Sequence, residues 1–194
     1  MSLPPPLPEP FDDIGLVTAL VLCWLSFYFI LTIWIFIHRY FTVGGYIDRE
    51  QTSLESLLLG QSDLPRISLL SGCVKRRNRI SREILEVCRQ KALQEATLGL
   101  TMLAIIASTA PFIGLFGTVV EILEAFFELG KGGSRASLDV IAPIISKALI
   151  ATAAGILTAI PAYSFHLFLK RKAFTLSSYL QMQIELLISP AEEE

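Results

Sequence analysis

Residues 148–169 read ALIATAAGILTAIPAYSFHLFL and contain no Asp, Glu, Lys or Arg, while Lys147 and Lys170 bracket them. A helix needs about 20 predominantly apolar residues to cross the hydrocarbon core of a bilayer, so this stretch has the length of a membrane span. Backbone polar groups must pair internally in lipid, which makes a helix the expected conformation. The stretch therefore predicts a transmembrane helix.

Two earlier runs have the same character. Residues 14–37 carry no charge between Asp13 and Arg39, and residues 96–120 carry none between Glu95 and Glu121. The whole chain is 53% hydrophobic and 18% charged, whereas a soluble domain has about 25% charged residues. Because the N-terminal tail lacks Lys and Arg, we expect the first run to be a permanent helix and not a cleaved signal peptide. The sequence thus predicts an all-α membrane protein with three transmembrane helices.

The distribution of positive charge predicts the orientation of the spans. The tail before the first span has no Lys or Arg, whereas residues 38–95 have ten and the last tail opens with Lys170, Arg171 and Lys172. Cytoplasmic segments carry the excess of Lys and Arg in membrane proteins. We therefore expect the N-terminus outside and the C-terminus inside the cytoplasm, with the basic residues at 75–82 meeting anionic lipid head groups. A net charge of -2 gives no electrostatic reason to expect nucleic-acid binding.

The expected organisation alternates tails, spans and one large cytoplasmic segment. In order, it comprises an outer N-tail at 1–13, a transmembrane helix at 14–37, a cytoplasmic helical segment at 38–95, a transmembrane helix with an outer extension at 96–129, an outer turn at 130–136, a transmembrane helix at 137–169, and a cytoplasmic C-terminal helix and tail at 170–194.

Helix signals between and after the spans refine this organisation. The stretch Thr52–Glu55 has capping-box spacing and predicts a short helix that Gly60 ends. From Ser81 the sequence has no helix breaker until Gly99, which predicts one helix that continues into the second span. Helical spacing also continues beyond the third span to Ile188. We therefore expect the second and third spans to extend as long cytoplasmic helices. The three cysteines show no metal-ligand spacing and are expected to be reduced.

Small residues recur at spacings of three and four in the second and third spans. They are Ala104, Ala107, Ser108, Pro111, Gly114, Gly117 and Thr118, and Ala148, Ala151, Thr152, Gly155, Thr158, Ala159 and Ala162. Such stripes let helices approach closely in lipid. They can serve only to pack the two spans together, or they can line the interior of an assembly with Thr118 and Thr152 as polar groups for an ion or a partner. The pattern leaves both interpretations open.

A depth estimate places the two threonines at similar heights. If the second helix ends near Leu129 and the third begins near Ser137, Thr118 and Thr152 lie about 16 Å and about 22 Å from the outer ends. By the same rise, Glu121 and Lys147 lie roughly 12 Å and 15 Å from those ends. The two threonines are therefore expected within about one turn of each other, and so are the two charges.

The sequence contains no recognisable catalytic constellation. It has two histidines and no paired metal ligands, nucleophile motif or phosphate-binding loop. His166 can either pack and anchor the third helix or relay protons. We therefore expect a protein that is not an enzyme and holds no metal.

The stretches STAPFIGLFGTVV at 108–120 and IAPIISKALIATAAGILTAIPA at 141–162 resemble the ExbB/TolQ/MotA family, closest to ExbB and TolQ. That family comprises channel subunits of machines driven by the proton-motive force. The resemblance implies a homopentamer around a central pore in the bacterial inner membrane, with a periplasmic N-terminus. It also implies an ExbD- or TolR-like single-span partner with an intramembrane aspartate, and a TonB- or TolA-like protein that receives the motion. No cofactor is implied beyond protons, or sodium ions, as the coupling ion.

The resemblance also assigns roles to individual residues. Thr118 matches the threonine of the family's GLFGTV motif, Thr152 matches that of ALIAT, and Pro111 and Pro161 match its helix-bending prolines. Gly114, Gly117 and Gly155 are expected at places of close helix packing.

Two positions depart from the family pattern. Lys147 stands where ExbB and TolQ usually have glutamate, and Glu121 stands where they usually have a small residue. Since a lysine in a cation path repels protons unless it is neutralised, we hypothesise that Glu121 neutralises Lys147 between neighbouring helices.

The expected function is that of a channel subunit in an ExbB–ExbD or TolQ–TolR type complex. Such a complex powers either TonB-dependent import or Tol-Pal envelope maintenance, and the resemblance fits both systems. The alternatives are a stand-alone ion channel or transporter, or a structural membrane scaffold that conducts no ions. A stand-alone channel would need its own intramembrane carboxylate, and the three apolar runs contain none.

Overall fold

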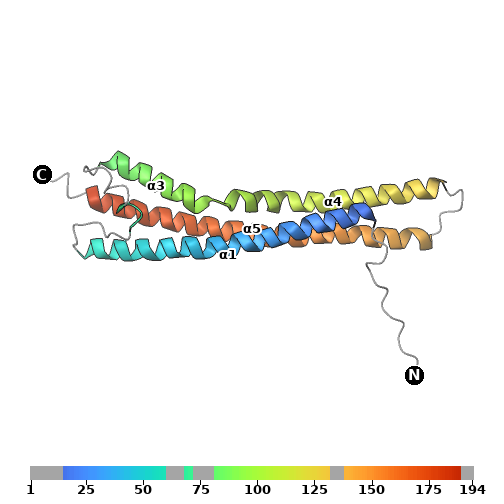
Figure 1. The fold of residues 1–194 in the computed structure, drawn as a ribbon, viewed down its shortest axis with the longest axis horizontal. Coiled ribbons are helices and arrows are strands. Elements are labelled where there is room, and N and C mark those ends of the chain that lie inside the picture. Colours follow the sequence, from blue (N-terminus) through green and yellow to red (C-terminus); the bar gives the residue numbers. More distant parts are fainter. Residues whose placement is uncertain (1–14, 60–67, 72–80, 132–137, 189–194) are drawn as a thin grey trace, which may run out of the picture. The chain divides into compact units, whose positions relative to one another are not determined.

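The computed structural model describes residues 15–59, 68–71, 81–131 and 138–188. In these residues the long elements are all helices: α1 (Leu16–Leu58), α3 (Arg82–Thr97), α4 (Leu100–Lys131) and α5 (Leu138–Ile188) (Figure 1). Among them α1, α4 and α5 are long and apolar enough to cross a membrane. The predicted all-helical architecture with three candidate spans is therefore confirmed for the described part of the chain.

Contacts divide the chain into two compact units, Met1–Thr32 with Ile105–Tyr163, and Ile33–Ala104 with Ser164–Glu194. We call them the first and the second unit. The first contains the beginning of α1, most of α4 and the beginning of α5, and the second contains the remaining parts of these helices and α3.

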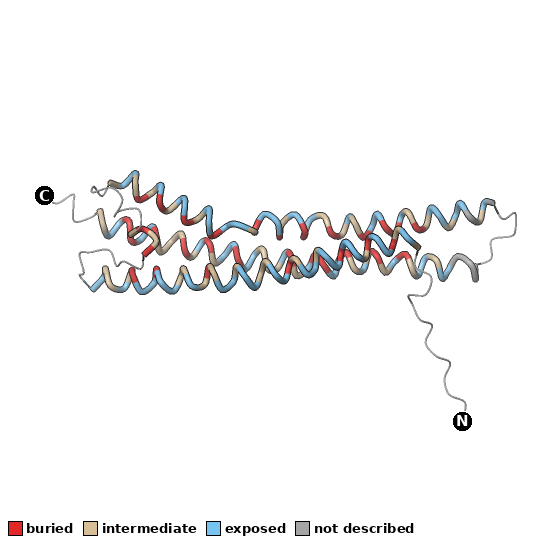
Figure 2. Tube along the Cα trace, viewed as in Figure 1, coloured by how far each residue is buried: buried red, intermediate tan, exposed pale blue. Residues whose placement is uncertain are grey.

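The first unit is a three-helix bundle with a core of small and branched side chains. Val21 and Leu25 of α1 pack against Ala110 of α4 and against Ala151 and Ala159 of α5. Small residues on α4 and α5 let those backbones approach, and the larger side chains of α1 fill the remaining space. Figure 2 shows buried positions along the inner faces of these helices and exposed positions on the outer faces.

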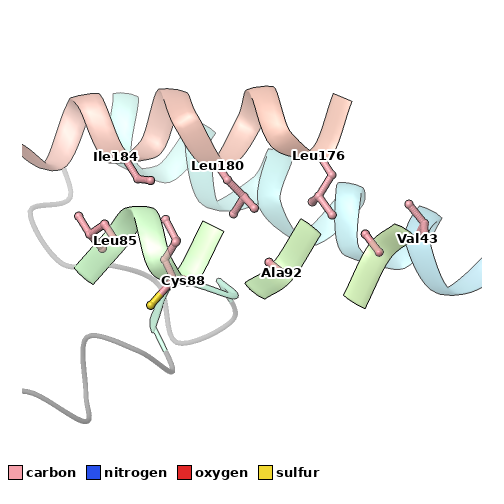
Figure 3. Packing of buried hydrophobic residues seen from close by; sticks show 9 residues of the cluster. Val43, Leu85, Cys88, Ala92, Leu176, Leu180 and Ile184 are labelled. Carbon is pink, nitrogen blue, oxygen red and sulfur yellow. The ribbon is translucent and has the colours of Figure 1, made fainter. Parts of the chain in front are cut away.

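The second unit has a larger apolar core built from three helices. Figure 3 shows Leu85, Cys88 and Ala92 of α3 facing Leu176, Leu180 and Ile184 of α5, with Val43 of α1 at one end of the cluster. The spacing of three and four residues on α3 and α5 is that of one helix face. This core explains why α3 packs along α5.

The short separate helix expected to begin near Thr52 is wrong, because α1 runs without interruption to Leu58. Thr52 lies inside α1, and its hydroxyl donates to the Asp48 carbonyl at 3.0 Å instead of capping a new helix. Gly44 and Gly45 do not end α1 either, although glycine has a low helix propensity. Buried Val43 and Glu50 anchor this part of α1 in the second unit, so packing outweighs the local capping signal.

The single helix expected from Ser81 into the second span is also wrong, because α3 ends at Thr97 and α4 begins at Leu100. Gly99 has a φ of 87°, a conformation that glycine adopts easily and other residues rarely do. Arg39 of α1 donates from Nη1 to the carbonyl of Glu95 at 3.3 Å and so satisfies a backbone acceptor at the end of α3. By contrast, α5 is one helix from Leu138 to Ile188, as its helical spacing predicts. Its cytoplasmic location stays a prediction.

The cysteines differ from one another. Cys23 is a free thiol on an exposed position of α1. Cys88 is disulfide-bonded, so the expectation of three reduced cysteines is wrong at this position. Spacing along the sequence does not reveal which sulfur atoms the fold brings together.

Candidate ion-path site

Two glycines bring α4 and α5 into backbone contact in the first unit. A Cβ placed on Gly114 would lie 2.6 Å from the carbonyl oxygen of Ala151, and a Cβ on Gly155 would lie 2.6 Å from that of Ala110. Real side chains do not approach backbone atoms so closely, so only glycine fits at either position. Close packing at Gly114 and Gly155, expected from their spacing, is what the structure shows. On the same face, a Cβ on Gly117 would lie 3.3 Å from Cβ of Ala151 and 3.2 Å from Val21.

This approach brings the hydroxyls of Thr118 and Thr152 together. The two Oγ1 atoms lie within hydrogen-bonding distance of each other, as the depth estimate predicts. Thr118 Oγ1 also lies 3.2 Å from the carbonyl oxygen of Gly114 on its own helix and 3.2 Å from that of Ala148 on α5. Thr118 is 7% exposed, while Thr152 is half-buried. A group from outside the single chain can therefore approach the two hydroxyls only from the side of Thr152.

The hydrogen-bonding capacity of this pair exceeds its supply of hydrogens. A threonine hydroxyl has one hydrogen and two lone pairs. The Thr118 hydrogen has three acceptors within reach, namely the carbonyls of Gly114 and Ala148 and the oxygen of Thr152. At any moment part of this acceptor set is free to receive a hydrogen from elsewhere. The site can therefore hold a cation or pass a proton by rearranging hydrogen bonds.

The two charged residues of the predicted site differ in burial. Glu121 is 8% exposed, and its Oε2 atom accepts no hydrogen bond from the described residues. Its Oε1 atom lies 3.6 Å from the position that a Cβ on Gly15 would take. Lys147 is half-buried and directly precedes Ala148, the carbonyl partner of Thr118. Neutralisation of Lys147 by Glu121 stays a prediction.

The remaining predicted residues lie inside the helices. Pro111 is within α4 and Pro161 is within α5, and both helices continue past them. Their proposed bending role stays a prediction. His166 belongs to the second unit, where its Nδ1 atom lies 3.0 Å from the carbonyl oxygen of Leu100. That contact favours the packing interpretation of His166, because a nitrogen bonded to a backbone carbonyl is engaged in holding α4 to α5. The described residues contain no group of three His, Cys, Asp or Glu that could hold a metal ion.

Sequence reasoning did not identify a buried polar cluster in the second unit. Glu50 of α1 is fully buried, and its carboxylate accepts hydrogen bonds from the Leu69 backbone N–H at 2.6 Å, the Ser68 hydroxyl at 3.0 Å and the Gln183 amide at 2.9 Å. These residues are distant in sequence, so no local pattern indicates the contact. The signal available from the sequence is an acidic residue on the same helix face as the apolar Tyr46, Ile47 and Leu54.

The comparisons with known proteins agree with the geometry of the α4–α5 pair. The model of the MotA/TolQ/ExbB proton channel family matches residues 64–182. The biopolymer transport protein ExbB-like 1 of Helicobacter pylori is 53% identical over 183 residues, which cover 92% of this chain and 95% of that protein.

Shorter matches relate the chain both to a protein named ExbB and to a protein named TolQ. The biopolymer transport protein ExbB of Neisseria gonorrhoeae is 51% identical over 73 residues, 38% of this chain and 33% of that protein. The Tol-Pal system protein TolQ of Haemophilus influenzae is 55% identical over 60 residues, 31% of this chain and 26% of that protein. Since the family model matches more than half of the chain and the Helicobacter relative matches nearly all of it, this chain belongs to the MotA/TolQ/ExbB proton channel family.

Proposed function

We propose that this chain is the channel subunit of an energy-transducing complex of the ExbB–ExbD or TolQ–TolR type, driven by the proton-motive force. The observation that carries the proposal is the hydrogen-bonded pair of Thr118 and Thr152, held between α4 and α5 by the backbone contact at Gly114 and Gly155. Hydroxyls at this depth are costly to place unless they have a role in packing or in the passage of an ion. Such a protein moves ions and transmits force, and it is not an enzyme.

The chain is a multi-pass protein of the bacterial inner membrane, because it belongs to this family and has three candidate spans. We infer further that its N-terminus is periplasmic and its C-terminus cytoplasmic. The support is the absence of Lys and Arg before α1 and their abundance in residues 38–95 and after residue 169.

A partner supplies the titrating group in this proposal. The apolar runs at 14–37, 96–120 and 148–169 contain no Asp or Glu, and Glu121 and Glu124 follow only in the last part of the candidate span Leu100–Phe127. A proton path through a membrane normally uses an intramembrane carboxylate, and the apolar runs that carry Thr118 and Thr152 supply none. An ExbD- or TolR-like single-span protein with an intramembrane aspartate fits this need. Its helix would face the half-buried Thr152, the accessible member of the pair, and the resulting motion would pass to a TonB- or TolA-like protein.

A homopentamer around a pore would cover much of the surface that one chain leaves open. Only 22%, 33% and 28% of the most apolar windows of α1, α4 and α5 are buried within the single chain. The uncovered faces must lie against lipid, other copies or the partner. Exposed Trp24, Phe27 and Trp34 suit α1 to the lipid-facing side. The coupling ion is the proton, with sodium as the alternative, and no cofactor takes part.

The test replaces each threonine by valine, which keeps the shape and removes the hydroxyl. The chain is reconstituted with its single-span partner in vesicles, and proton flux is measured under an imposed pH gradient. We expect Thr118→Val and Thr152→Val each to lower the flux about tenfold or more, since one lost hydrogen bond of about 1.4 kcal/mol has that effect on a rate. Thr158→Val is the matched control, because Thr158 is also buried in α5 but its hydroxyl donates to Ala154 in the same helix at 2.9 Å.

Two other outcomes would favour the alternatives. Unchanged flux in both threonine variants, with complex assembly intact, would support a packing role and a scaffold. Proton flux through the chain without its partner would support a stand-alone channel, because the titrating group would then lie in this chain.

A further inference from the structure

Two buried polar atoms of the first unit lack hydrogen-bond partners among the described residues near the beginning of α1. They are Oγ1 of Thr18, a residue that is 2% exposed, and Oε2 of Glu121, a residue that is 8% exposed. Leaving a buried polar group unsatisfied costs about 1–3 kcal/mol, so native proteins pair such atoms with protein or with ordered water. Two such atoms close to the beginning of one helix call for an explanation.

Contacts on either side of Thr18 place it against the part of α4 that carries Glu121. Val21, three residues after Thr18, lies against Gly117. Gly15, three residues before Thr18, lies against the carboxylate of Glu121. These two contacts show that α1 and α4 run antiparallel here. Thr18 precedes Val21 by three residues, so along the helix axis it lies about 4.5 Å beyond Val21 on the side toward Glu121. Thr18 and Glu121 therefore lie at one level, about one turn from Thr118.

The position of Thr18 at the beginning of α1 removes the usual acceptor four residues earlier in the helix, and its hydroxyl does not use the carbonyl of Gly15 three residues earlier either. A threonine inside a helix commonly donates to the carbonyl four residues earlier, as Thr42 does to His38 at 2.8 Å and Thr158 does to Ala154 at 2.9 Å. Thr18 is the third residue of α1, so the residue four positions earlier precedes the helix. Thr32, the other buried threonine of α1 without a partner among the described residues, lies in mid-helix, where rotation of its side chain reaches such a carbonyl.

The beginning of α1 is also a favourable place for a carboxylate. The first backbone N–H groups of a helix have no acceptor within the helix, and the helix dipole adds positive potential there. The N–H of Ala19 donates to the carbonyl of Gly15 at 3.0 Å, and the N–H groups before it have no acceptor within the helix. Among the described residues, the other charged groups on this stretch of α4 and α5 are the half-buried Lys147 and the exposed Glu124.

We propose that Thr18 is a positioning residue that holds the Glu121 carboxylate through one ordered water molecule at the beginning of α1. The water has three kinds of partner, namely Glu121 Oε2, Thr18 Oγ1 and a free N–H of the first turn, which is the number that a buried water needs. Through this site α1 is connected to the polar path that begins at Thr118 and Thr152. That last consequence rests on the proposed function, whereas the pairing of Thr18 with Glu121 does not.

Coupling between the two side chains is measured by a double-mutant cycle on thermal unfolding of the full chain in detergent. The variants are Thr18→Val, Glu121→Gln and the double variant. We expect the decrease in Tm of the double variant to be smaller than the sum of the two single decreases, because either substitution already breaks the shared site. Thr32→Val combined with Glu121→Gln is the matched control and should give additive decreases. Additive decreases for Thr18 and Glu121 as well would overturn the proposal.

A second measurement separates positioning from general packing. The carboxyl vibration of Glu121, identified in the infrared spectrum by its loss in Glu121→Gln, should shift in Thr18→Val and return in Thr18→Ser, which restores a hydroxyl. A frequency that is unchanged in Thr18→Val would contradict the proposal. If Thr118→Val leaves proton flux intact while the Thr18–Glu121 coupling is present, the proposed function is wrong and this inference stands. If Thr118→Val abolishes flux and the coupling is absent, only this inference is wrong.

Discussion

At the scale of single residues, Glu50 is the side chain whose replacement should disturb the second unit most. Three donors converge on its buried carboxylate, from Leu69, Ser68 and Gln183. Gln183 also donates to the backbone carbonyl of Glu50 at 2.9 Å, so the cluster ties α1, α5 and the segment at 68–71 together. A carboxylate suits the cluster because it offers only acceptors to these donors.

We expect Glu50→Ala to destabilise the chain by about 2–5 kcal/mol, because it leaves several buried donors without acceptors. Glu50→Gln should lower the free energy of unfolding by a smaller but still measurable amount, since its amide NH2 group would point at another hydrogen-bond donor. Glu55→Gln is the control, because Glu55 is exposed on the same helix and its carboxylate accepts a hydrogen bond from the exposed Gln51 at 3.4 Å. Thermal unfolding in detergent measures all three. Equal stability of Glu50→Ala and Glu55→Gln would contradict the importance of the cluster.

At the scale of elements, the contact between α4 and α5 determines whether the threonine pair can form. Gly114→Ala would place a methyl group 2.6 Å from the Ala151 carbonyl, which the backbone can relieve only by moving the helices apart. Overpacking of this kind costs about 1–3 kcal/mol. We expect a lower Tm and, because the Thr118–Thr152 contact then lengthens, a loss of proton flux similar to that of Thr118→Val.

The matched control for this glycine lies on α1. A Cβ on Gly45 would meet nothing within 4 Å, and alanine is favoured over glycine in a helix by about 1 kcal/mol. Gly45→Ala should therefore leave the Tm unchanged or raise it. A similar decrease in Tm for both alanine variants would mean that helix propensity, and not the α4–α5 contact, explains the result.

The elements also show which features the sequence could predict. The spans and the common level of Thr118 and Thr152 follow from hydropathy and from the fixed rise of a helix, and both quantities are local. The break at Gly99 and the continuity of α1 past Thr52 depend on contacts with distant residues, such as Arg39 with Glu95. The same holds for the Glu50 cluster, because its partners are brought together only by the fold. Glu121 shows the same difference within the site. Its depth along α4 follows from the rise per residue of a helix, but its contact with Gly15 of α1 depends on the fold and cannot be predicted from the sequence.

At the scale of the whole molecule, the orientation in the membrane is the property on which the proposed mechanism depends. The positive charge of residues 38–95 and of the C-terminal tail is the reason why we propose that both lie in the cytoplasm. The disulfide of Cys88 points the other way, because disulfides are rare in the reducing cytoplasm of most bacteria. Charge should decide, since the membrane potential and the insertion machinery act on the chain before a disulfide can form. On the cytoplasmic side, the reducing thiol pool is expected to open the disulfide that the structure shows at Cys88.

Labelling with a membrane-impermeant maleimide tests this orientation directly. In cells with a permeabilised outer membrane, Ser2→Cys should react, while Ser189→Cys should react only after the inner membrane is opened. The parent chain is the control in both steps: its exposed Cys23 lies within an apolar span that the reagent does not enter, and any labelling of Cys73 or Cys88 after the inner membrane is opened is subtracted. Acid trapping of thiols followed by mass spectrometry gives the redox state of Cys88 in the same cells. Labelling of Ser189→Cys in intact cells together with an oxidised Cys88 would reverse the orientation. The end of α4 that carries Glu121 would then face the cytoplasm.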